Sequence, residues 1–136
     1  MRCGRLLWFV AVAGIAAFVG AACGDGGDRL ETLKSDPMAS YELPGALDAT
    51  FTEMAGGTAQ IASPSEVTRR FIVAAGGVDA AIEEMAAAAV DAGWELRPRE
   101  VVGFSGDKRI DGLRAQMVIS GTDDNNHVWI TISSRS

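Results

Sequence analysis

Residues 78–92 have the periodicity of an α-helix, and the stretches on both sides of this segment alternate like β-strands. Apolar side chains recur at helical spacing on one face: Val78, Ile82, Met85, Ala86, Ala89 and Val90. The pair Gly76-Gly77 precedes the segment, and Gly93 follows it as a predicted left-handed cap. The alanines in 86–89 make the apolar face thin, so this helix can approach a sheet closely. One helix among several strands predicts an α+β fold.

Alternation of apolar and polar residues identifies the strands. The clearest candidates are residues 66–74, 113–120 and 128–133. Weaker ones are residues 50–54 and a strand from Trp94 to Arg97 that Pro98 limits and that residues 101–104 continue. Polar residues over 105–112 and 121–127 predict turns. We therefore expect an antiparallel sheet of four to five strands with a single helix, about 78–92, packed on one face.

The N-terminus has the order of features found in a secretory signal peptide. Arg2 and Arg5 supply positive charge, residues 6–19 are uncharged and mostly apolar, and small residues follow at 20–22. A permanent transmembrane helix is the alternative, but the uncharged stretch is shorter than the roughly 20 residues that a span requires. Export to the extracytoplasmic side is therefore predicted.

The motif Ala21-Ala22-Cys23 resembles the lipobox of bacterial lipoproteins. The resemblance implies that the Cys23 thiol receives a diacylglyceryl group, that the peptide before it is removed, and that the new N-terminus is acylated by a fatty acid such as palmitate. The family prefers Leu, Val or Ile three positions before the cysteine, where this chain has Gly20. The alternative is ordinary cleavage near Ala22, which leaves a free thiol. The resemblance implies a lipid-anchored protein of the cell membrane.

These features divide the chain into a signal peptide over 1–22, a lipidated cysteine and flexible tether over 23–48, and an α+β domain over 49–136. The tether is expected to lie partly against the domain through Met38, Tyr41 and Leu43. The whole chain carries a formal charge of −6, and loss of Arg2 and Arg5 makes the mature part −8. This acidity argues against nucleic acid as a partner. Cys23 is the only mature cysteine, so stability must come from packing.

The sequence contains no recognisable catalytic constellation, metal site or cofactor motif. His127 is the only histidine and has no cysteine partners for a zinc site. Residues 103–107 lack the spacing of a nucleophile elbow. Glu83 and Glu84 are adjacent on the predicted helix and point in different directions. We therefore expect a non-enzymatic protein without a metal or cofactor.

The sheet face away from the helix is expected to carry Arg114, Gln116, Trp129 and Thr131, and to be either solvated or covered by the tether. Arg69 and Arg70 alternate, so one of them, taken as Arg70, joins this face. Arg70, Arg114 and Trp129 are thus the candidate partner-binding residues, with plain surface packing as the alternative. The predicted function is an envelope lipoprotein with a binding or accessory role toward an envelope protein. The alternatives are an unanchored secreted domain and an enzyme with an unrecognised site.

Overall fold

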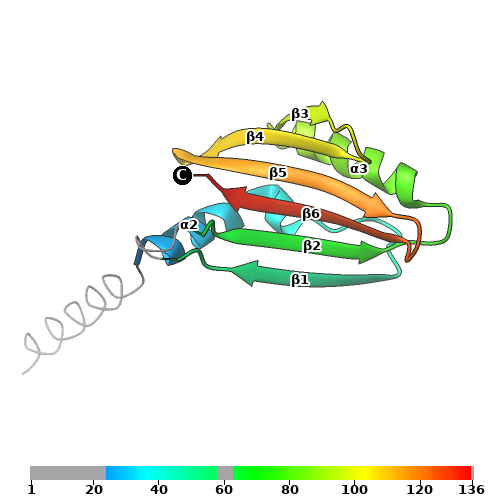
Figure 1. The fold of residues 1–136 in the computed structure, drawn as a ribbon, viewed down its shortest axis with the longest axis horizontal. Helices are drawn as coiled ribbons and strands as arrows, with labels where there is room; N and C mark the ends of the chain where they lie inside the picture. The colour runs from blue at the N-terminus through cyan, green and yellow to red at the C-terminus, as the bar shows by residue number, and fades with distance from the viewer. Residues whose placement is uncertain (1–23, 58–62, 136) are drawn as a thin grey trace, which may run out of the picture.

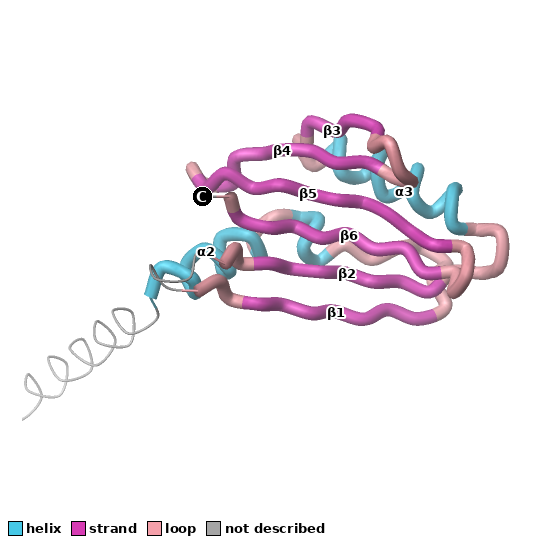
Figure 2. Tube along the Cα trace, viewed as in Figure 1, coloured by secondary structure: helices cyan, strands magenta, loops and turns pink. Residues whose placement is uncertain are grey.

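The computed structural model describes residues 24–57 and 63–135, which form one antiparallel sheet with helices on one face (Figures 1 and 2). The sheet has six strands in the order β1-β2-β6-β5-β4-β3. The α+β class is confirmed, whereas the predicted four to five strands and single helix are too few. The elements are α2 (Gly24–Lys34), the 3-10 helix η1 (Pro37–Ser40), β1 (Asp48–Met54), β2 (Glu66–Ile72), α3 (Val78–Asp91), β3 (Glu95–Pro98), β4 (Phe104–Ile110), β5 (Leu113–Thr122) and β6 (His127–Ser134).

Helix α3 forms where the periodicity predicted it, and its C-terminus is fixed by Gly93. This glycine has φ +91°, a conformation that favours glycine. The N–H of Trp94 donates to the carbonyl of Ala89 at 3.0 Å, and the N–H of Gly93 donates to that of Val90 at 2.9 Å. Together these bonds make a Schellman motif. The motif turns the chain sharply back, so that Trp94 enters the core and β3 begins beside the sheet.

The extra strand is β4, which occupies residues where the sequence predicted a polar turn. Phe104, Gly106, Lys108 and Ile110 point to the helix-covered side, but glycine and lysine at two of these positions hid the apolar alternation. Gly106 is needed because a Cβ there would lie 2.6 Å from the carbonyl oxygen of Glu95 on β3. The prediction that residues 101–104 continue the preceding strand is also wrong. The close contact between β4 and β3, rather than a turn, explains why residue 106 is glycine.

The segment expected to be a flexible tether is largely ordered structure. Residues 24–34 form α2, and Leu33, Met38 and Leu43 are buried in the core. The glycines read as flexible have a packing role instead, since a Cβ on Gly26 would lie 2.3 Å from a carbonyl oxygen of residue 56. The expected apolar contacts through Met38 and Leu43 are confirmed. The prediction that residues 24–28 form a flexible linker is wrong. Glycine is favoured in flexible segments, but it is also required where two backbone segments are in close contact, as at Gly26.

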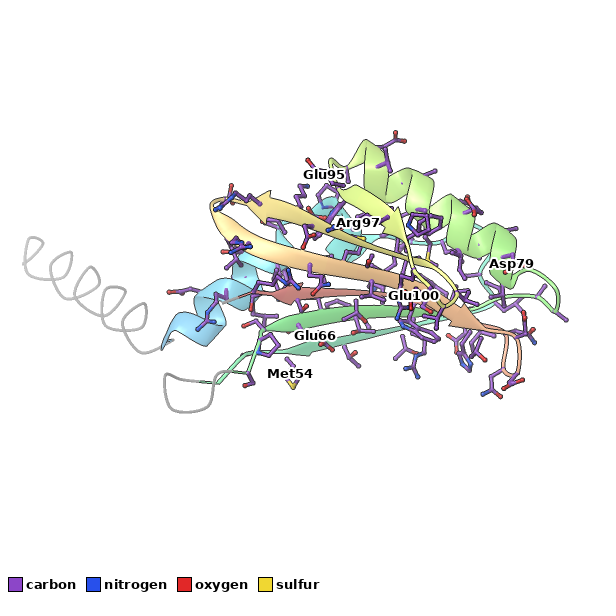
Figure 3. All side chains as sticks on the ribbon, turned by 45° about the horizontal axis from the view of Figure 1, so that its top comes forward. Met54, Glu66, Asp79, Glu95, Arg97 and Glu100 are labelled. Carbon is purple, nitrogen blue, oxygen red and sulfur yellow. The ribbon has the colours of Figure 1, made fainter. Side chains whose placement is uncertain are left out.

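The two sheet faces differ in cover, since the helices pack on one face only, while on the other the loop at Val102 contacts Ser120. The buried apolar side chains of the central strands all have one parity, and both helices lie on that side; they are Val67, Phe71, Ala115, Met117, Ile119, Val128, Ile130 and Ile132. Figure 3 shows α3 spread along this side, with Asp79 in its first turn. The opposite parity forms what we call the open face, which includes Thr68, Arg70, Arg114, Gln116, Val118, Trp129 and Thr131. Segment 24–48 lies on the helix side, so it does not cover the open face.

Candidate functional site

Arg70 and Trp129 meet on the open face, as their strand parity predicted. They are directly paired between β2 and β6, and the guanidinium carbon of Arg70 lies 6.0 Å from the Trp129 ring centroid. Thr50 on β1 pairs with Arg70, and Ser120 on β5 pairs with Trp129, so one row crosses four strands. Arg70 is exposed and Trp129 is half-buried. A cation stacked near an accessible aromatic ring is a common element of protein interfaces.

Arg114, the third predicted partner-binding residue, lies far from this pair. The residue of β5 that pairs with Trp129 is Ser120, six positions along the strand from Arg114. At about 3.4 Å per residue, this separation is roughly 20 Å. The structure therefore brings together only two of the three predicted residues. Parity in the sequence assigned Arg114 to the correct face but contained no information on its position along the sheet.

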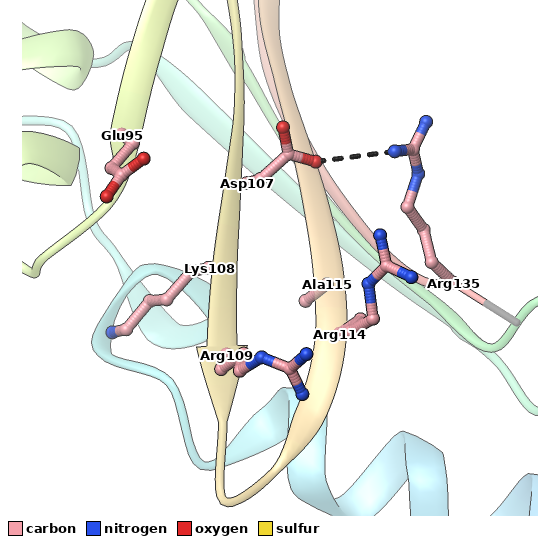
Figure 4. Close-up of a pocket in the computed structure, with 7 residues that line it drawn as sticks. All are labelled: Glu95, Asp107, Lys108, Arg109, Arg114, Ala115 and Arg135. Atoms are coloured by element: carbon pink, nitrogen blue, oxygen red, sulfur yellow. Dashed lines mark ion pairs between the residues drawn. The ribbon is translucent and has the colours of Figure 1, made fainter.

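Arg114 belongs instead to a group of arginines at the β4–β5 turn, which we call the basic end: Arg109, Arg114 and Arg135. Arg109 and Arg114 are directly paired across β4 and β5. The N–H of Arg135 donates to the carbonyl of Arg114 at 2.8 Å, which fixes the third arginine beside them. These residues border an open hollow of about 470 Å³, whose lining also includes Glu95, Asp107, Lys108 and Ala115 (Figure 4).

Asp107 is the carboxylate that pairs with the basic end. One of its oxygens, Oδ1, lies 3.6 Å from Nη1 of Arg135, while Oδ2 accepts a hydrogen bond from Arg97 on β3. Lys108 has the opposite parity, and its side chain extends on the other side of β4 from Arg114 (Figure 4). The ammonium group of Lys108 therefore does not add to the charge of the basic end.

Lys108 instead completes a buried polar cluster around Asp36. The Asp36 side chain is fully buried, and its carboxylate accepts hydrogen bonds from Nε1 of Trp94 at 3.1 Å and from the backbone N–H of Met38 at 2.9 Å. Nζ of Lys108 lies 2.6 Å from the other carboxylate oxygen and also donates to the carbonyl of Ala92. Every polar atom is thus satisfied, so this cluster holds the N-terminal segment against the sheet rather than presenting a reactive group.

This cluster was not predicted from the sequence, although one local signal of it is present there. Asp36 precedes Pro37, and an aspartate followed by proline is the usual start of a helical turn. Asp36 is indeed the N-cap of η1. The signal identifies the cap, but the two side-chain partners of Asp36 are Trp94, just before β3, and Lys108 on β4, which lie 58 and 72 positions away in the sequence.

Among the described residues, two ionisable groups have shifted pKa values, and neither lies at the open face or the basic end. Hydrogen bonds to Glu53 and then Glu31 raise the pKa of Lys34. Burial, followed by the charge of Glu84, raises the pKa of Tyr41. Both changes favour the protonated form, so neither group is converted into a base at neutral pH.

The other candidates from the sequence remain dispersed. His127 starts β6 opposite Thr122, and Glu83 and Glu84 are exposed on α3. Within residues 24–57 and 63–135, no three His, Cys, Asp or Glu side chains gather in a way that suits a metal ion. Cys23 and the apolar stretch over 6–19 lie outside the described residues. Among the helices that are described, none has the length and apolar character to cross a membrane.

Comparison with protein-family models, curated proteins and solved structures yields no match to this chain. The functional interpretation therefore depends on the residues and geometry described above.

Proposed function

We propose that this protein is a cell-envelope lipoprotein, anchored through lipid on Cys23, whose domain binds a partner protein on the extracytoplasmic side without catalysing a reaction. The anchoring half of the proposal depends on the sequence 1–23, with its apolar stretch and lipobox-like ending. The binding half depends on the open face. The two halves are independent and are tested separately.

One observation carries the binding proposal: both helices cover the same face of the sheet, and the other face presents the Arg70–Trp129 pair. Tryptophan and arginine are the residues that most often dominate binding energy at interfaces. The surrounding open-face residues are mainly small or polar, including Thr50, Thr68 and Thr131, so the face remains compatible with water when no partner is bound.

The two alternative functions, an unanchored secreted domain and an enzyme, each predict a specific observation. An unanchored secreted domain would have the same fold and the same open face, with a free thiol at Cys23. An enzyme would require several ionisable groups with shifted pKa values gathered in one pocket. In the part of the chain that the structure describes, the two raised pKa values belong to Lys34 and Tyr41, which lie outside the hollow at the basic end. The binding role therefore has the better support.

Replacing Cys23 by alanine is expected to abolish lipidation, because the thiol is the only atom to which the diacylglyceryl group can attach. The variant should leave the membrane fraction or accumulate as the uncleaved precursor. Intact-mass analysis of wild type and Cys23→Ala, together with membrane fractionation, makes the measurement. A wild-type mature protein with an unmodified Cys23 would eliminate the anchoring proposal and favour the secreted alternative.

A photoreactive residue at Thr50 is expected to form an adduct with an envelope protein, because Thr50 is exposed and pairs with Arg70. The matched control is the same group at Ala87, which is exposed on α3 on the helix side. Adding Arg70→Ala should reduce the Thr50 adduct by about tenfold while leaving stability nearly unchanged. Equal adduct yields from positions 50 and 87, or no effect of Arg70→Ala, would contradict binding at the open face.

A further inference from the structure

The three arginines of the basic end carry more positive charge than their surroundings neutralise. Arg109 and Arg114 are directly opposite one another on β4 and β5, an arrangement of like charges that destabilises a sheet. Arg114 makes no side-chain hydrogen bond or ion pair with the described part of the chain. Arg109 donates to the carbonyl of Gly112 at 3.4 Å. Arg135 adds a third guanidinium group, which lies beside that of Arg114 in Figure 4.

The nearby carboxylates do not cancel this charge. Asp107 is shared between Arg135 and Arg97, so it neutralises less than one of the three arginines. Glu95 borders the hollow from β3, where it pairs with Asp107 on the same face as Arg114, but β4 lies between Glu95 and Arg114 and no ion pair joins Glu95 to the basic end among the described residues (Figure 4). Asp111 is exposed in the β4–β5 turn and, among the residues that the structure describes, makes no ion pair with Arg109 or Arg114. An anion in the hollow would relieve the repulsion and accept charge-assisted hydrogen bonds.

The basic end lies at the same end of the sheet as the start of α2 (Figures 1 and 4). Helix α2 begins at Gly24, the residue directly after Cys23, and Gly26 is bound into the domain by a 2.8 Å hydrogen bond from Oγ of Ser65 to its carbonyl. A lipid on Cys23 would therefore be joined to the folded domain without a long spacer. Such an anchor would keep the basic end near the phosphates of the bilayer surface.

We propose that Arg109, Arg114 and Arg135 form an anion site that binds the phosphate group of an anionic phospholipid headgroup. The choice of a lipid as the source rests on the proposed anchoring at Cys23; the phosphate chemistry rests on the arginines alone. Guanidinium groups match phosphate geometry and remain charged at all physiological pH values. The mature chain is strongly acidic overall, so a local site, rather than the general field of the protein, must provide this attraction.

The test uses the full chain, purified as the expressing cell processes it and kept in a neutral detergent. NMR signals of the arginine Nε–Hε groups are followed during titration with dihexanoylphosphatidylglycerol, dihexanoylphosphatidylcholine or inorganic phosphate. We expect the anionic lipid, and not the zwitterionic one, to shift the signals of the basic end. Arg114→Gln should raise the apparent Kd for the anionic lipid by about tenfold, since one charge-assisted contact is lost. Added salt should weaken binding as well.

Arg99→Gln is the matched control. Arg99 follows β3 at the opposite end of the sheet, where it donates to the carbonyl of Val102 at 3.3 Å, and its loss removes the same charge. The Kd of this variant should stay within about twofold of wild type, because charges a Debye length apart are largely screened. Equal weakening by both variants, or no response to the anionic lipid, would overturn the site. Binding of inorganic phosphate as tightly as the lipid would overturn the lipid as source.

Failure of the anion site and failure of anchoring are distinguishable, because the short-chain lipids bind from solution and do not require Cys23 to be acylated. An unmodified Cys23 with intact lipid binding would overturn the anchor alone. A lipidated Cys23 without lipid-dependent signal changes would overturn the anion site alone.

Discussion

Replacement of Trp94 by alanine is expected to lower the free energy of unfolding by about 3–5 kcal/mol, because it removes a buried ring and leaves a cavity. Trp94 is 3% exposed and lies directly after the Schellman motif that ends α3. Its loss also removes a hydrogen bond to the buried Asp36 carboxylate. Small domains have total stabilities of about 5–15 kcal/mol, so the variant should be close to unfolding. Chemical denaturation of the purified protein gives the measurement.

Trp129→Ala is the control for this experiment, since it deletes the same side chain from the open face. Trp129 is half-buried and faces away from the helices, so its loss should cost less. Trp94→Phe should lower the free energy of unfolding by less than Trp94→Ala does, because phenylalanine keeps an aromatic ring in the core. It should still be destabilising, because phenylalanine lacks the N–H group that donates a hydrogen bond to Asp36. A loss for Trp129→Ala equal to or greater than that for Trp94→Ala would mean that the two sheet faces are assigned the wrong way round.

Lys108→Met is expected to lower the free energy of unfolding by about 3 kcal/mol, because it leaves the carboxylate of Asp36 buried without its cation. Methionine preserves the apolar length of the side chain, so the effect isolates the charge. Asp36 has a fully buried side chain, whereas that of Lys108 is 21% exposed, which places this pair between a surface and an interior ion pair.

The double variant Asp36→Asn/Lys108→Met tests the same pair from the other side. Asparagine can still accept from Met38 and Trp94 but does not carry the charge that Lys108 neutralises. We expect the double variant to recover much of the stability lost in Lys108→Met, with a coupling energy above 1 kcal/mol in the double-mutant cycle. A loss under about 0.5 kcal/mol for Lys108→Met would be the behaviour of an exposed pair and would contradict a structural role for the cluster.

Local patterns in the sequence were sufficient for those elements whose apolar residues follow one period. Helix α3 and strands β2, β5 and β6 occur within two residues of their predicted bounds. Strand β4 was missed because its inward positions include Gly106 and Lys108, whose roles depend on Glu95 of β3 and Asp36 of the N-terminal segment. These partners are distant in the sequence, so no local pattern records them.

The same distinction applies to the functional surfaces. Strand parity placed Arg70, Arg114 and Trp129 on one face, and that prediction is confirmed by the register of the sheet. The separation of Arg114 from the other two, and its association with Arg109 and Arg135, required the tertiary structure.

The sequence by itself determined the α+β class, the main helix and the face on which each central side chain lies, because helical period and strand alternation are properties of neighbouring residues. Only the tertiary structure decided that residues 24–48 belong to the folded domain and that three arginines meet at the β4–β5 turn. The physical reason is that strand register and close backbone contacts, such as that of Gly26 with residue 56, arise between segments far apart in the chain.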